Sequence, residues 1–117
     1  MKKLDDIVEN VNMKFSIIYI TTGDIDEARN IGRKLVEEGL VACANIFPIT
    51  SIFRWKGNID EANEFGIMLK TRSDKVKKIE AIVKKIHSYE IPCIVSFNID
   101  EGSAEYLKWI NESMNVI

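Results

Sequence analysis

Two long runs of strand-forming residues flank one tight-turn signal, and this arrangement restricts the folds open to the chain. The runs cover residues 42–56 and 59–72, about 14 residues each, whereas most strands have about five or six. At about 3.3 Å per residue each run would extend about 45 Å, more than the roughly 30 to 35 Å diameter of a compact domain of this size. Part of the hairpin must therefore protrude from the domain.

The turn between the two runs is Gly57-Asn58. Glycine at the first central position of a two-residue loop favours a type II′ hairpin, in which Lys56 would face Ile59. Pro48 interrupts the first run, and because proline cannot donate to a sheet ladder it predicts a bend or bulge there.

The segments around the hairpin carry clear helix and strand signals. Asp24 can cap a helix that Gly39 closes, and Ser73 and Ser103 can cap two more. The expected order is a strand over 15–20 buried on both faces, a helix over 24–39, the hairpin, a helix over 73–86, a strand over 93–99 and a helix from 103. This order predicts an α+β fold, the ferredoxin-like βαββαβ sandwich plus a C-terminal helix. Residues 1–12 are interpreted as an N-terminal arm or helix, and 13–117 as the domain.

Composition excludes several classes of function. Sixteen basic and eighteen acidic residues give a net charge of -2, without the basic patch that binds nucleic acid. No stretch approaches the roughly 20 apolar residues that span a bilayer, and none has the apolar length of a signal peptide. We therefore expect a cytoplasmic protein with neither nucleic acid nor membrane as a partner.

Apolar residues occur on both faces of the protruding part of the hairpin. Ile52 and Phe65 are expected on one face, and Phe53 and Trp55 on the other. Long exposed strands with aromatic side chains pair with another chain unless they are covered. The hairpin therefore predicts a homo-oligomer, with Trp55, Phe53 and Phe65 at the interface.

The stretch "IHSYEIPC" concentrates the chemically versatile side chains. His87, the only histidine, precedes Tyr89, Glu90 and Cys93. Imidazole is a good ligand for copper or zinc, but a single histidine cannot close a metal site by itself. The alternative is that His87 only stabilises the end of its helix, where a protonated imidazole is favourable. Lys70 could pair with Glu90 beside a pocket for a small anionic ligand.

Four separated motifs, "EGLVACANI", "TSIFRWKGNIDEANEFGIMLKT", "IHSYEIP" and "EYLKWI", resemble the CutA divalent-cation-tolerance family. The resemblance implies a trimeric ferredoxin-like protein linked to tolerance of copper and other divalent cations, similar in assembly to PII-like proteins. It implies His87 as the metal ligand, and Cys43, Lys70, Tyr89 and Glu90 as residues of a cleft between subunits. Copper-binding members can carry a cysteine and a second histidine where this chain has Thr21 and Ile86.

We therefore expect a non-enzymatic homotrimer that binds divalent cations weakly, has no obligatory cofactor and takes copper or another divalent cation as its candidate ligand. The alternative is a PII-like signalling or scaffold module, which would bind a small anionic ligand or a protein partner at the cleft between subunits.

Overall fold

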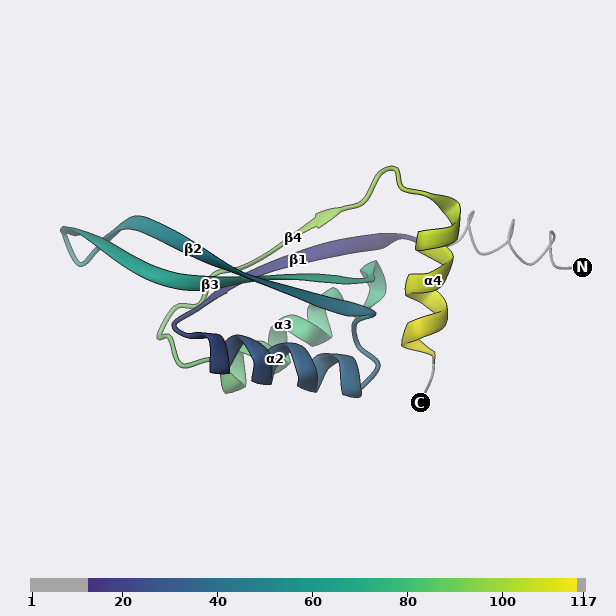
Figure 1. Cartoon of the computed structure of the whole chain (residues 1–117), viewed down its shortest axis with the longest axis horizontal. Coiled ribbons are helices and arrows are strands. Elements are labelled where there is room, and N and C mark those ends of the chain that lie inside the picture. The colour runs from purple at the N-terminus through teal and green to yellow at the C-terminus, as the bar shows by residue number, and fades with distance from the viewer. Residues whose placement is uncertain (1–12, 116–117) are drawn as a thin grey trace, which may run out of the picture.

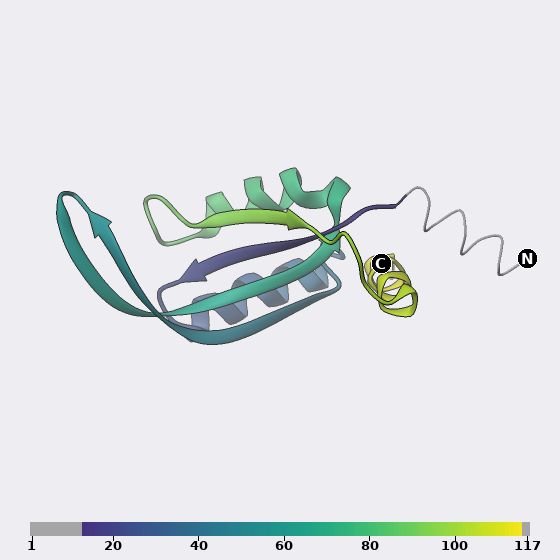
Figure 2. The same cartoon turned by 90° about the horizontal axis from the view of Figure 1, so that it is seen from above.

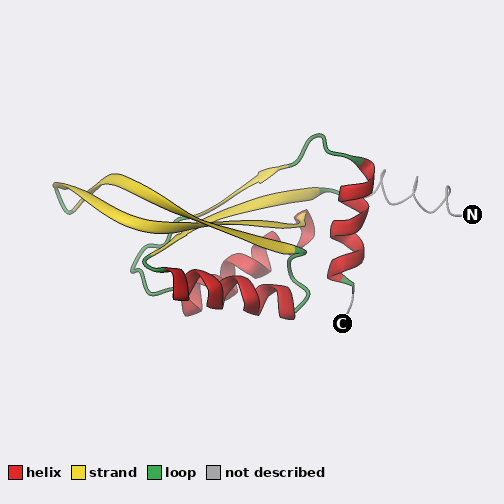
Figure 3. Ribbon diagram, in the orientation of Figure 1, coloured by secondary structure: helices red, strands yellow, loops and turns green. Residues whose placement is uncertain are grey.

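The computed structural model describes residues 13–115 of the 117-residue chain. The predicted N-terminal arm, residues 1–12, lies outside the described residues. The elements in chain order are β1 (Phe15–Thr22), α2 (Ile25–Glu37), β2 (Cys43–Trp55), β3 (Asn58–Arg72), the 3-10 turn η1 (Ser73–Lys75), α3 (Val76–Ile86), β4 (Ile94–Asn98) and α4 (Ala104–Met114). This is the predicted βαββαβ order plus a C-terminal helix (Figure 3).

The four strands form one antiparallel sheet in the order β2-β3-β1-β4. Helices α2 and α3 cover one face of the sheet, and α4 lies across its end (Figure 1). Ile18 and Ile20 of β1 are buried beneath the helices together with Ile67 and Leu69 of β3. The core therefore lies between the sheet and the α2/α3 layer.

The predicted burial of β1 on both faces is only half correct. Ile17, Tyr19 and Thr21 alternate with the buried residues and are only partly buried. They share the open face of the sheet with Val95 and Phe97 of β4, which are about half exposed. The helices cover a single face because both crossovers run on the same side of the sheet (Figure 2).

The long hairpin protrudes as predicted. The chain measures 58 × 26 × 22 Å, with a radius of gyration of 16.0 Å, against about 13 Å for a compact chain of this length. The β2–β3 arm extends beyond the ends of β1 and β4 and curls away from the helices (Figures 1 and 2). Among residues 13–115, no layer covers the outer part of this arm.

The predicted turn of the hairpin is wrong by one residue, and the predicted register by two. Trp55 pairs with Asn58, so the loop is Lys56-Gly57, with φ values of 52° and 86°. Two central residues with positive φ define a type I′ turn, which suits the twist of a hairpin. A shift of two residues leaves each side chain on its predicted face.

Two other local predictions are also corrected. Pro48 pairs with Phe65 within an unbroken register, so of the predicted bend or bulge the bulge is absent. Proline is tolerated because β2 is an edge strand of this sheet. Ser73 does not cap α3: it begins η1, and its hydroxyl lies 2.7 Å from the Ser16 Oγ. The predicted caps Asp24 and Ser103 are confirmed by hydrogen bonds from Glu27 N and Tyr106 N.

Candidate functional site

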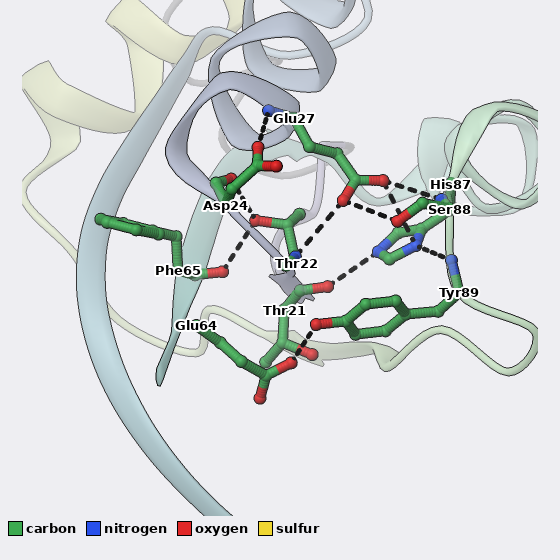
Figure 4. A network of polar contacts seen from close by, with 10 residues as sticks. Thr21, Thr22, Asp24, Glu27, Glu64, Phe65, His87, Ser88 and Tyr89 are labelled. Atoms are coloured by element: carbon green, nitrogen blue, oxygen red, sulfur yellow. Dashed lines mark hydrogen bonds and ion pairs between the residues drawn. The ribbon is translucent and has the colours of Figure 1, made fainter. Parts of the chain in front are cut away.

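His87 joins the end of α3 to the end of β1. Its side chain is fully buried, and Nε2 lies 2.8 Å from the carbonyl oxygen of Thr21. Nδ1 lies 3.0 Å from the backbone nitrogen of Tyr89. Because a backbone N–H can only donate, Nδ1 is the acceptor, and Nε2–H therefore donates to Thr21. Both ring nitrogens therefore have protein partners (Figure 4).

The ring of His87 is therefore directed into the protein and not out of the core. The Thr21 carbonyl and the Tyr89 N–H are partly removed from water, and the imidazole supplies a hydrogen-bond partner for each. A metal ion could bind a ring nitrogen of His87 only if that nitrogen lost its hydrogen bond with Thr21 or Tyr89. The role of His87 as a metal ligand stays a prediction.

Glu27 connects the start of α2 to the turn after α3. Its carboxylate accepts hydrogen bonds from Ser88 N at 2.8 Å, Ser88 Oγ at 2.9 Å and Gly23 N at 3.3 Å. Burial alone would raise the pKa of Glu27, but these hydrogen bonds outweigh it, and the pKa is lowered. Sequence spacing gives no sign of this contact, since Ser88 lies 61 positions from Glu27.

Replacing Glu27 with glutamine is expected to destabilise the protein by about 1 to 3 kcal/mol at pH 7, since charged acceptors form the stronger hydrogen bonds. Folding lowers the pKa of Glu27, so its contribution is complete above the unfolded pKa of about 4.3 and is lost as pH falls through the folded pKa. Urea unfolding at pH 7 and pH 3.5 should show the difference between the two proteins shrinking in acid. The exposed Glu37→Gln is the control, and an equal effect of both changes would contradict this role.

A cleft of about 650 Å³ lies between the outer hairpin and the segment that follows His87. Its lining includes three aromatic residues, Phe53, Trp55 and Tyr89, and three acidic residues, Asp60, Glu64 and Glu90. The cleft thus brings together four residues predicted from the sequence, namely Phe53, Trp55, Tyr89 and Glu90. Asp60 and Glu64 were not predicted from the sequence. The alternation of side chains along β3 places both on the same face of the hairpin as Trp55.

Tyr89 and Glu64 form the inner wall of this cleft. The Tyr89 hydroxyl donates to the Glu64 carboxylate (Figure 4). Burial, and then this hydrogen bond and the negative charge of Glu64, raise the pKa of Tyr89. Burial likewise raises the pKa of the Cys93 thiol. The phenol therefore keeps its proton at neutral pH and donates a hydrogen bond, and Cys93 is not an activated nucleophile.

The remaining predicted residues lie at the other end of the sheet. Cys43 pairs with Lys70, whose ammonium donates to the Asn45 side chain. The Cys43 Sγ lies 3.7 Å from the Tyr106 hydroxyl, and burial together with this contact raises the pKa of Tyr106 to about 12. Along β3, Lys70 stands six residues from Glu64, a separation of about 20 Å. One chain therefore does not bring Lys70 to Glu90.

The predicted interface residues differ in exposure. Phe53 is 40% exposed and Trp55 is 36% exposed, whereas Phe65 packs against the core of its own chain.

Within residues 13–115, no group of three or more histidine, cysteine, aspartate or glutamate side chains could hold a metal ion. None of the described helices has both the length and the apolar character needed to cross a membrane.

The fold and the cleft define a class of small α+β proteins with a ferredoxin-like core and a protruding hairpin. A family model described as CutA1 divalent ion tolerance protein matches residues 16–113. The chain belongs to this family.

Individual relatives agree with this assignment. The divalent-cation tolerance protein CutA of Archaeoglobus fulgidus is 46% identical over 99 residues, which cover 85% of this chain and 97% of that protein. A solved structure from the same organism has a TM-score of 0.84 at 44% identity, covering 86% of this chain and 99% of that one. The Thermus thermophilus structure, "Divalent cation tolerance protein (Cut A1)", has a TM-score of 0.81 at 41% identity, covering 85% and 97%.

These comparisons contradict the predicted cellular location and give no support to one of the two predicted functions. The solved Archaeoglobus structure is described as a periplasmic divalent cation tolerance protein, which contradicts the cytoplasmic location predicted from the sequence. The prediction relied on the lack of a long apolar segment, and that feature does not determine the compartment. The comparisons support a tolerance-protein family and give no support to the PII-like alternative.

Proposed function

We propose that the protein acts in divalent-cation tolerance as a homotrimer that binds divalent cations, copper among them, weakly and without catalysing a reaction. Membership of the CutA1 family over residues 16–113 carries this proposal. Weak binding accords with the described residues, which provide no group of three metal-ligating side chains within one chain. A cation would therefore find an incomplete set of ligands unless a second subunit contributed to it.

Two surfaces support assembly into an oligomer. The outer hairpin exposes Phe53 and Trp55 around the cleft, and the open sheet face exposes Val95 and Phe97. On that same face, the rings of Tyr19 and Phe47 stack with centroids 6.3 Å apart. Exposing these apolar side chains to water is unfavourable, so their burial against further copies of the chain is favoured. We propose that Phe53 and Trp55 contact a neighbouring subunit, and that Cys43 and Lys70 approach Tyr89 and Glu90 only across that boundary.

Titrating the metal-free, tag-free protein with copper(II) tests the cation proposal. We expect weak, saturable binding, and absence of any divalent-cation binding would contradict the proposal. Because both ring nitrogens of His87 have partners, His87→Gln should keep the affinity within about threefold. A loss above about tenfold, roughly 1.4 kcal/mol, would show that the ring leaves Thr21 or Tyr89 to bind the metal, as the sequence predicted. Lys84→Gln on the exposed side of α3 is the matched control.

A further inference from the structure

The protein has a second apolar core beneath α4, at the end of the sheet where β1 begins (Figure 1). The buried members of this second core are Phe15, Ala42, Ile110 and Met114. Three further apolar residues pack against them but are only partly buried: Met13, Ile99 and Leu107. All three line a groove of about 420 Å³. The groove is therefore the open side of the second core.

The lining of the groove is apolar at its base and polar at its border. The three partly buried apolar residues form the base, whereas Lys14, Asn98 and Asp100 are exposed around it. Apolar side chains left open beside a core favour a covering layer that removes them from water. A segment with one apolar face and one charged face matches a groove of this kind.

Residues 1–12, with the sequence MKKLDDIVENVN, have this character. Their apolar residues are spaced by three and four positions and would share one face of a helix: Leu4, Ile7, Val8 and Val11. The charged residues of the segment occupy the other positions. A helix this short is marginal in water by itself. Its apolar face therefore needs a surface on which to pack.

The place where the segment joins the domain favours this groove. Met13, the residue that follows the segment, is itself part of the lining. In a helix, Leu4 would lie about 14 Å from Met13, so the segment need not cross the molecule to reach the groove. The charges agree as well, because Lys2 and Lys3 begin the segment and Asp100 borders the groove.

We propose that residues 1–12 dock on this groove of their own chain, with their apolar face against Met13, Ile99 and Leu107. The docked segment covers the open side of the second core and holds α4 against the start of β1. This interaction surface lies at the opposite end of the sheet from the cleft beside the hairpin and does not depend on the cation-tolerance proposal.

Hydrogen exchange of the native, full-length protein, measured by mass spectrometry, tests the docking. We expect the amides of residues 4–12 to exchange at least about tenfold more slowly than in an unstructured chain of the same sequence. Ile7→Gln should remove this protection, whereas Glu9→Gln, on the other face of the helix, should keep it. Exchange at the unstructured rate in the parent protein, as expected if the groove stays open or another copy covers it, would overturn the proposal.

A second pair of variants tests where the segment docks. Ala104 is exposed and lines the groove, so Ala104→Trp places a large side chain in the space of the segment and should remove the protection of residues 4–12. Glu105→Trp adds the same side chain at the next exposed position, outside the lining, and should leave the protection unchanged. Protection that survives Ala104→Trp would place the segment elsewhere and overturn the proposal. Ile7→Gln changes no residue of the domain, so its effect reports docking and not a folding defect.

Discussion

Replacing His87 with alanine is expected to lower the free energy of unfolding by about 3 to 5 kcal/mol. The change leaves the Thr21 carbonyl and the Tyr89 N–H without their partners, at a cost of about 1 to 3 kcal/mol each. The fully buried ring also leaves a cavity. His87 therefore stabilises the protein mainly by holding the end of α3 to the end of β1.

Urea unfolding at one fixed protomer concentration measures this effect, because assembly makes the stability of an oligomer depend on concentration. Lys85→Ala, an exposed change on the last turn of α3, serves as the control and should shift stability by less than about 0.5 kcal/mol. A loss below about 1 kcal/mol for His87→Ala would mean that the ring does not hold these two backbone groups.

Replacing Trp55 with alanine is expected to weaken assembly by about 2 kcal/mol or more for each interface that contains this side chain. Truncating an aromatic anchor at the centre of an interface typically costs that much binding free energy. Trp55 is the last residue of β2, far from the core under α2 and α3. The fold of each chain should therefore survive while the assembly loosens.

Sedimentation over a range of concentrations, together with circular dichroism, separates these two effects. The variant should dissociate at concentrations where the parent remains assembled, with its helical signal intact. Lys78→Ala changes an exposed residue of α3 and should leave assembly unaffected. A Trp55→Ala protein that assembles like the parent would show that Trp55 lines the cleft without anchoring an interface.

Local signals were enough to predict most of the fold. Asp24 and Ser103 act as caps through hydrogen bonds within three residues, and Gly39 has the positive φ that ends α2. The hairpin register was missed because the turn places Lys56 at φ 52°. A non-glycine residue rarely adopts that conformation, so the sequence favoured Gly57 as the first turn residue.

The site was less predictable because its contacts are distant in sequence. Tyr89 and Glu90 could be identified from their own motif, whereas Glu64 meets Tyr89 across 25 residues and Glu27 meets Ser88 across 61. The orientation of His87 depended on Thr21, at the end of a strand 66 residues away. Sequence spacing alone contains no information on such pairings, which arise only when α3 docks beside β1.

The mass of the native particle tests whether the exposed hairpin and the open sheet face are covered by two further copies of the chain. Light scattering on the tag-free protein at micromolar concentration should give about three times the chain mass of 13.4 kDa. A mass of one or two chains that holds as the concentration is raised would contradict the trimer and the cleft between subunits proposed with it.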